Sequence, residues 1–306
     1  MIIKSLQAGL AQMRANKRML IVFYLSNLFF GLILMLPFRG VLSNFVGNSK
    51  MGEKLAGRFD MNFLFEFVEN NDQIADMFGT LVPLVPIIFW LFLLFLSGGA
   101  FAVFAGGDKY MPAAFWGGCA GYFGRFIRLV LWSLPVGAVL FCLQFLVPLF
   151  QKLFFGSDPY QNITYWGGWI KFGLRYISII LFALLLDYAR IHAVMTDERK
   201  MRLSVWNALK FIYANFLKAF GLAFLLFLIG VVMLVVYNLI ADTMSAPAAF
   251  VVILLLLFQQ TYMIARMMLR LTVYSSQLNL FRGLSVRKPA AVEAEEGDVG
   301  IEGAPA

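Results

Sequence analysis

The stretch "FGLAFLLFLIGVVMLVVYNLI", residues 220–240, runs for 21 residues without a charged side chain. A helix needs about 20 apolar residues to cross the roughly 30 Å of hydrocarbon in a bilayer. Inside lipid, every backbone polar group must find its partner within the protein, and a helix meets this condition by itself. The stretch therefore predicts a transmembrane helix.

Five further stretches have the same character. The six predicted spans are Met19–Leu36, Leu81–Leu96, Leu129–Phe150, Phe172–Leu186 (continuing to about Ala193), Phe220–Ile240 and Ala246–Ala265. The first is longer than the apolar region of a signal peptide, so we expect it to be retained. The second begins with Pro83 and Pro86, which a first turn or a kink tolerates. We expect an all-α polytopic transmembrane bundle of about six spans, forming a single domain over residues 1–288.

The composition supports a membrane protein. Of the 306 residues, 61% are apolar and only 14% are charged, and the mean hydropathy is +0.80. A soluble domain carries about 25% charged residues, so this chain has too few to cover a water-facing surface. The lipid bilayer is thus the expected partner. The net charge of +8 does not indicate nucleic-acid binding, because the basic residues lie between the spans and report topology.

The distribution of basic residues predicts the orientation. With the N-terminus inside, the external segments hold seven of the 25 Lys and Arg residues, namely Arg39, Lys50, Lys54, Arg58, Lys152, Lys171 and Arg175. The cytoplasmic segments hold the other 18. Cytoplasmic loops carry an excess of Lys and Arg, so we expect N- and C-termini in the cytoplasm of a bacterial inner-membrane protein.

The external loop, residues 37–80, is expected to contain a short amphipathic helix. Asp60 is a suitable N-cap, and Phe63, Leu64, Phe67 and Val68 recur at helical spacing. Two interpretations remain open: the helix lies in the outer membrane interface, or it packs down onto the bundle.

Two features near the cytoplasmic side complete the outline. Ser204 is expected to cap a short interfacial helix before the fifth span, with Val205, Leu209 and Ile212 on one side. The last 18 residues, 289–306, are rich in Ala, Gly and Glu and contain no aromatic residue. They predict a disordered acidic cytoplasmic tail.

Polar residues inside a bilayer are the best pointers to function. We expect a candidate polar cluster in the inner half of the membrane, made by Asp187, Arg190, Gln259, Tyr262 and Arg266. The spacing places the first two on one face of span four and the other three on one face of span six. One interpretation is a substrate or anion site. The other is structural, with an ion pair and interhelical hydrogen bonds worth about 0.6–2 kcal/mol each.

Glycine is concentrated in residues 97–128, "SGGAFAVFAGGDKYMPAAFWGGCAGYFGRFIR". The order of the glycines matches no phosphate-binding loop. The candidate helix-packing glycines are Gly98, Gly99, Gly117, Gly121 and Gly124. Small residues at this spacing let two helix backbones approach closely, and a ligand-facing backbone surface is the alternative.

The sequence contains few of the residue types and motifs that enzymes use for catalysis. His192 is the only histidine, and Cys119 and Cys142 have no metal-ligand spacing. No nucleophile turn of the G-x-S-x-G kind occurs. We therefore expect no catalytic residue, no metal and no cofactor, and hence no enzyme.

Two motif regions carry a resemblance. The first is "LSGGAFAVFAGG…AAFWGGCAGYFGRFIRL", and the second is "LLLDYARIHAVMTDERK…ALKFI". They resemble a group of uncharacterised bacterial six-span integral membrane proteins with an Asp-Tyr-Ala-Arg motif at the end of span four. The matching positions here are Gly98, Gly99, Gly121, Tyr122, Phe123, Arg125, Phe126, Asp187, Tyr188, Ala189 and Arg190. The architecture is also similar to the membrane domain of glycerophosphodiester phosphodiesterases, although the phosphodiesterase catalytic domain is not in this sequence.

Two functions are consistent with these patterns. The first is a non-enzymatic scaffold or accessory subunit that binds lipid or protein partners, including other membrane proteins or further copies of itself in a homo-oligomer. The alternative is a small permease or transporter component that uses the polar cluster around Asp187. A transporter needs a solvated cavity at the depth of Asp187, whereas a scaffold is dry and packed there.

Overall fold

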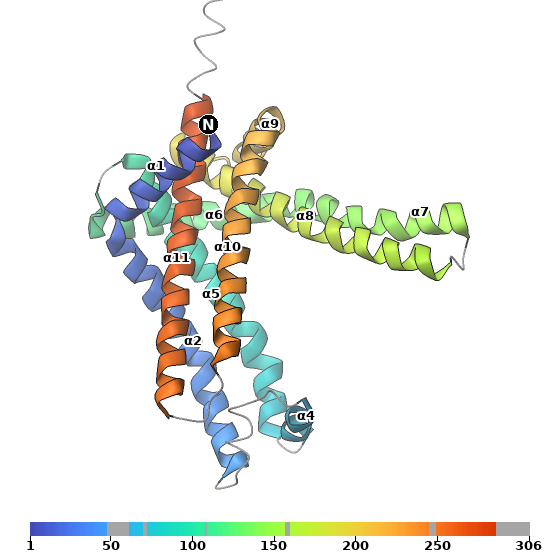
Figure 1. Cartoon of the computed structure of the whole chain (residues 1–306). Helices are drawn as coiled ribbons and strands as arrows, with labels where there is room; N and C mark the ends of the chain where they lie inside the picture. Colours follow the sequence, from blue (N-terminus) through green and yellow to red (C-terminus); the bar gives the residue numbers. More distant parts are fainter. Residues whose placement is uncertain (48–60, 70–71, 108, 157–159, 245–248, 286–306) are drawn as a thin grey trace, which may run out of the picture. The chain divides into compact units, whose positions relative to one another are not determined.

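The computed structural model describes residues 1–47, 61–69, 72–107, 109–156, 160–244 and 249–285 (Figure 1). Its helices are α1 (Ile2–Ala15), α2 (Lys17–Val46), α4 (Met61–Glu69), α5 (Asp72–Gly106), α6 (Pro112–Cys142), α7 (Leu146–Phe155), α8 (Gln161–Met195), α9 (Met201–Ala214), α10 (Phe216–Thr243) and α11 (Ala249–Ser285). A turn of 3₁₀-helix, Leu143–Phe145, joins α6 to α7. The described residues contain no strand, so the predicted all-α class is confirmed.

Six helical stretches are long and apolar enough to cross a membrane, as predicted for a multi-pass protein. They are Lys17–Val46, Gly79–Gly106, Pro112–Phe155, Gln161–Met195, Phe216–Thr243 and Phe250–Ser285. Each predicted span falls on one of them, except that residues 246–248 of the sixth lie outside the described residues, and the helices extend further. The 35 residues of α8 make a helix about 52 Å long at 1.5 Å per residue, which exceeds the thickness of the hydrocarbon. Pro83 and Pro86 lie well inside α5 rather than in its first turn.

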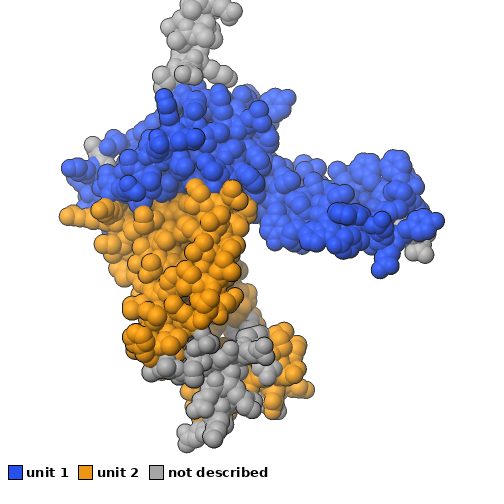
Figure 2. Space-filling model, viewed as in Figure 1, with its two compact units in different colours: residues 1–15, 98–226, 272–306 blue, residues 16–97, 227–271 orange. Residues whose placement is uncertain are grey.

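The chain forms two compact units, each built from segments that are distant in sequence (Figure 2). Unit 1 comprises residues 1–15, 98–226 and 272–306, and unit 2 comprises residues 16–97 and 227–271. Helices α5, α10 and α11 each contribute to both units. The predicted tail, residues 289–306, and the predicted N-cap Asp60 lie outside the described residues.

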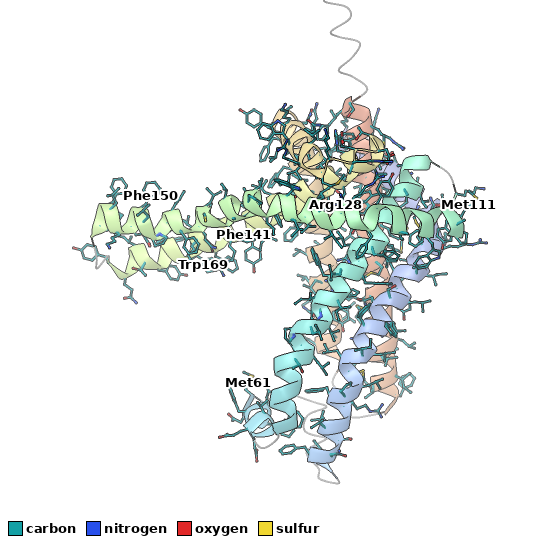
Figure 3. The ribbon with its side chains drawn as sticks, turned by 180° about the vertical axis from the view of Figure 1, so that it is seen from behind. Met61, Met111, Arg128, Phe141, Phe150 and Trp169 are labelled. Carbon is teal, nitrogen blue, oxygen red and sulfur yellow. The ribbon has the colours of Figure 1, made fainter. Side chains whose placement is uncertain are left out.

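Unit 1 contains an antiparallel hairpin in which α6 and α7 lie along α8 (Figures 1 and 3). Two side-chain hydrogen bonds join the helices of this hairpin. The Ser178 hydroxyl donates to the carbonyl of Leu140 at 2.7 Å, and the Gln151 amide donates to the carbonyl of Ile163 at 2.8 Å. Large apolar side chains such as Phe150 and Trp169 remain exposed on the hairpin. This exposure is what a lipid-facing surface requires.

Helix α9 packs against α8 and α6 in unit 1. It begins at Met201, with Lys200 at the N-cap position, so the prediction that Ser204 caps this helix is wrong. Ser204 is instead buried inside the helix, on the same face as Val205 and Ile212. Of the three residues predicted to share a side of this helix, Val205 and Ile212 are buried and Leu209 is half-buried.

Helix α1 docks on the C-terminal part of α11, also within unit 1. Gly9 lies so close to α11 that an added Cβ would be 2.7 Å from the backbone nitrogen of Ser276. The Ser275 hydroxyl donates to the carbonyl of Gly9 at 2.9 Å, and the Asn279 amide donates to Gln12 at 3.1 Å. A glycine at the contact and small polar partners allow this approach.

In unit 2, helix α4 packs on the end of α2. The ring centroids of Phe45 lie 5.8 Å from Phe63 and 5.1 Å from Phe67, and Phe38 also contacts Phe67. Phe67 is fully buried, whereas Phe65 on the other side of α4 is 64% exposed. The predicted apolar face is thus confirmed, and of the two interpretations the structure supports packing onto the transmembrane helices.

Candidate functional site

Asp187 and Arg190 form an ion pair near the end of α8. They are three residues apart, which places them on one face of the helix. Their side chains are only 13% and 12% exposed, respectively. The Arg190 Nε also donates to the carbonyl of Leu186 at 3.2 Å, in the preceding turn. Both charges are therefore compensated within α8 itself.

Two aromatic rings from other helices enclose Arg190. Its guanidinium carbon lies 5.7 Å from the ring centroid of Phe101 on α5 and 5.7 Å from that of Tyr274 on α11. The two rings are themselves in contact, with centroids 4.8 Å apart. A cation over an aromatic face gains about 0.5–2 kcal/mol, more when it is desolvated. We call these four residues (Asp187, Arg190, Phe101 and Tyr274) the ion-pair core.

The residues of α8 next to the ion-pair core, Tyr188 and His192, also contact other helices or the end of α8. Tyr188 is fully buried, and its ring centroid lies 5.0 Å from that of Phe211 on α9. Its hydroxyl is buried and has no hydrogen-bond partner among the described residues. One turn later, the His192 ring lies 3.3 Å from the Asn207 amide and 3.5 Å from the Thr196 hydroxyl. The contacts of Tyr188 with Phe211 and of His192 with Asn207 join α8 to α9, whereas the contact of His192 with Thr196 lies within the end of α8.

The other residues of the predicted cluster belong to unit 2, whereas Asp187 and Arg190 belong to unit 1. On α11, Gln259 and Arg266 are exposed, and Tyr262 stacks on Tyr237 of α10 with centroids 4.6 Å apart. The interhelical hydrogen bond is made by the next residue, Gln260, which accepts from the Tyr24 hydroxyl of α2 at 2.8 Å. The candidate cluster predicted from the sequence did not include Gln260.

The glycines divide by the face of the helix on which they lie. At Gly98, an added Cβ would be 3.1 Å from the Gly118 carbonyl oxygen, and at Gly99 it would be 2.5 Å from the Phe115 carbonyl oxygen. Both glycines therefore lie at the close contact of α5 with α6. On α6 the contact residue is Gly118, where a Cβ would be 2.6 Å from Ala102. An added Cβ would meet nothing within 4 Å at any of the three other predicted glycines, which are Gly117, Gly121 and Gly124. These three lie on the side of α6 that faces away from α5.

A basic pocket, which sequence reasoning missed, lies between α6 and the start of α9. Its volume is about 280 Å³, and its lining includes Arg128, Trp132, Arg199, Lys200, Arg202 and Leu203. The sequence signal was present as the run "ERKMR" at 198–202, but its proximity to Arg128 depends on the fold.

The turn that carries this pocket is fixed to α6. Asp197 has a φ of +46°, in the left-handed region that Asp tolerates in tight turns. Arg125 donates to its carboxylate, and this hydrogen bond and the charge of Arg125 hold the pKa of Asp197 below its usual range. Glu198 accepts from the backbone nitrogen of Lys200 at 2.9 Å. The partner of Asp197 thus lies outside the pocket lining, whereas Glu198 caps the backbone of Lys200, which lines it.

Within the described part of the chain, no three His, Cys, Asp or Glu side chains come together in a way that could hold a metal ion. The chain matches no family model, no curated protein and no solved structure at a significant level. The function is therefore inferred from the residues themselves.

Proposed function

We propose that this chain is a non-enzymatic integral protein of the bacterial inner membrane, with both termini in the cytoplasm. It serves as a scaffold or accessory subunit that binds lipid or protein partners. The orientation and the compartment rest on the excess of Lys and Arg in the segments assigned to the cytoplasm. The bacterial origin rests on the resemblance of the Asp-Tyr-Ala-Arg motif at residues 187–190.

The observation that carries this proposal is the packing of the ion-pair core. An ionisable residue inside a membrane usually lines a solvated pathway or pairs with a neighbour. Here Arg190 is held by Asp187 and by the rings of Phe101 and Tyr274. The residues that follow Asp187, namely Tyr188 and Ala189, are fully buried. A buried, compensated ion pair supports a rigid framework for the helices, and a permease would need water at this depth.

Thiol accessibility tests this proposal directly. In a background of Cys119→Ala and Cys142→Ala, we would introduce Ala189→Cys beside the ion-pair core and Tyr213→Cys as an exposed control. A small membrane-permeant thiol reagent should label Tyr213→Cys quickly and leave Ala189→Cys unlabelled until the protein is denatured. Rapid labelling of Ala189→Cys in the folded protein would favour the permease alternative.

Purification in a mild detergent then addresses the partners. Lipids and proteins that remain with the chain would be identified together by mass spectrometry. A scaffold should retain a partner in a fixed ratio, and a substitution that loosens the core, Arg190→Ala, should lower that ratio. A chain that is protected at Ala189→Cys but retains nothing would contradict the partner-binding part of the proposal.

A further inference from the structure

The basic pocket between α6 and α9 gathers four cations with no acid among the lining residues. Arg128 comes from α6, and Arg199, Lys200 and Arg202 come from the turn and the first residues of α9. All four side chains are exposed. Like charges this close repel one another, and the repulsion is weakened only by solvent or by a bound anion. The first turn of α9 contains no acidic residue to offset them.

The orientation of α9 adds to this positive potential. A helix N-terminus carries a partial positive charge, so cations placed beside it are unfavourable. Arg202 lies in the first turn of α9, and Lys200 lies at its N-cap position. The nearest carboxylates offset this charge only in part: Asp197 is paired with Arg125, and the single remaining carboxylate, Glu198, is outnumbered by the four cations of the lining. The pocket therefore favours an anion.

One wall of the pocket is apolar. Trp132 lies one turn after Arg128 on α6 and is 52% exposed. Further along α6 on the same face, Pro135 and Val139 are also exposed and apolar. Figure 3 labels Arg128 on α6 and Phe141 further along the same helix, toward the distal end of the hairpin. A ligand seated in the pocket thus meets charge at one end and exposed apolar side chains of α6 at the other.

This combination is the one that an anionic lipid would complement. Tryptophan is enriched where the hydrocarbon meets the headgroups, and basic pockets between transmembrane helices bind anionic headgroups. The pocket volume, about 280 Å³, is the share of roughly nine water molecules in the liquid, which is enough for a phosphate group with some hydration. A free phosphate would use the cations but not the apolar wall.

We infer that this pocket binds the headgroup of an anionic phospholipid. Arg128, Arg199 and Arg202 contact the phosphate oxygens, for which the planar guanidinium is suited. Lys200 contributes a further positive charge, and Trp132 contacts the acyl chain. The inference rests on the proposed function in taking a lipid as one of the partners, and it names the class of that lipid and the residues that hold it.

The test compares two charge-matched triple variants of the full-length protein. The pocket variant carries Arg128→Gln, Arg199→Gln and Arg202→Gln. The control variant carries Lys4→Gln, Arg14→Gln and Arg18→Gln, which remove three exposed cations from the other basic segment assigned to the cytoplasm. Each protein is placed in nanodiscs of phosphatidylcholine with increasing phosphatidylglycerol, and the phosphatidylglycerol retained after detergent extraction is measured by native mass spectrometry.

The pocket variant should retain phosphatidylglycerol with an affinity lower by on the order of a hundredfold, since three of the four cations that attract the anionic headgroup are removed. The control variant should bind like the wild type. Equal retention by all three proteins would overturn the inference. If the pocket variant does not elute as a folded species, the single variant Arg202→Gln replaces it, with Arg14→Gln as its control.

A second measurement separates a lipid from a free phosphate. Trp132→Ala should weaken phosphatidylglycerol retention several-fold, and inorganic phosphate should compete with the lipid poorly. Full displacement by inorganic phosphate, together with unchanged retention in Trp132→Ala, would overturn the lipid assignment in favour of a phosphate site. Labelling of Ala189→Cys is independent of this pocket. Loss of lipid specificity with Ala189→Cys still protected would therefore refute this inference and leave the proposed function standing.

Discussion

Arg190 is stable within a membrane-spanning helix because its guanidinium has three favourable interactions. It forms an ion pair with Asp187 and cation–π contacts with Phe101 and Tyr274. A lone charge near the centre of a transmembrane helix costs about 2.5–3.5 kcal/mol on insertion scales. The two charges of the ion-pair core therefore depend on each other. Removing one leaves the other buried without compensation.

The first prediction follows from this dependence. Arg190→Ala should lower the yield of folded protein more than the double variant Asp187→Ala/Arg190→Ala. Both variants lack the arginine side chain, so a lower yield of the single variant reports the orphaned carboxylate. Size-exclusion profiles of fluorescent fusions in detergent would measure the yield. Wild-type behaviour of Asp187→Ala and Arg190→Ala alike would show that water already compensates each charge.

The second prediction concerns the glycine contact between α5 and α6. Gly99→Ala would bring a Cβ to 2.5 Å from the Phe115 carbonyl, whereas Gly121→Ala meets nothing within 4 Å. Forcing a methyl group into such a contact costs about 1–3 kcal/mol, while an alanine on an open helix face gains up to about 1 kcal/mol in helix propensity. The apparent Tm in detergent should fall for Gly99→Ala and stay level or rise for Gly121→Ala. A fall of equal size in both would contradict the assigned contact.

For single residues, the sequence predicts contacts within one helix well and contacts between helices poorly. The spacing of Asp187 and Arg190 predicted that they share a face, and the structure pairs them. Phe101 and Tyr274 could not be assigned to Arg190, because an aromatic residue that faces lipid and one that faces a cation have the same hydropathy. Gln259 and Gln260 differ only by one step of rotation around α11, and only the fold shows which one faces α2.

At the scale of elements, α4 is the clearest case of a local pattern that predicts its own packing. Its apolar face was predictable from the spacing of Phe63 and Phe67. Its surface of attachment was not, because Phe38 and Phe45 lie in the part of α2 that extends past the predicted first span. The start of α9 was also mispredicted, since Ser is only statistically preferred at an N-cap and Lys200 occupies that position.

The third prediction tests the anchoring of α4. Phe67→Ala should loosen α4, because truncating a buried Phe costs about 3–5 kcal/mol, while Phe65→Ala removes an exposed ring and should not. Cleavage after Glu66 and Glu69 by a glutamate-specific protease, followed on purified protein, would report the loosening. Wild-type cleavage rates in Phe67→Ala would mean that α4 does not depend on this aromatic contact.

At the scale of the whole molecule, the spans were predictable because composition alone decides whether a helix can face lipid. The two units were not, because each joins segments that are distant in sequence. The contact of Gly9 with Ser276 is an example. Neither residue carries a pattern that points to the other, and only the complete fold brings α1 onto α11.

The fourth prediction concerns orientation. Alkaline phosphatase fusions after Gly47 and Gly156 should be active, because these positions end the helices that the charge bias directs outward. Phosphatase fusions after Lys200 and Ser285 should be inactive. GFP fusions at the same two positions should be fluorescent, because this reporter matures in the cytoplasm. Phosphatase activity after Lys200 would overturn the orientation and would place the basic pocket on the opposite face of the membrane.

The docking of α1 on the end of α11 also has a consequence for the order of assembly. The ribosome makes α1 first, and Ser275 and Ser276, which contact Gly9, follow after almost the whole of the described chain. At about 5–20 residues per second, the delay is on the order of tens of seconds, longer than helix formation or collapse require. During that interval the five preceding spans can be inserted while the Gly9 face of α1 still lacks this partner. The packing of α1 against α11 is therefore a late step in folding, because it requires that the last span has already been synthesised.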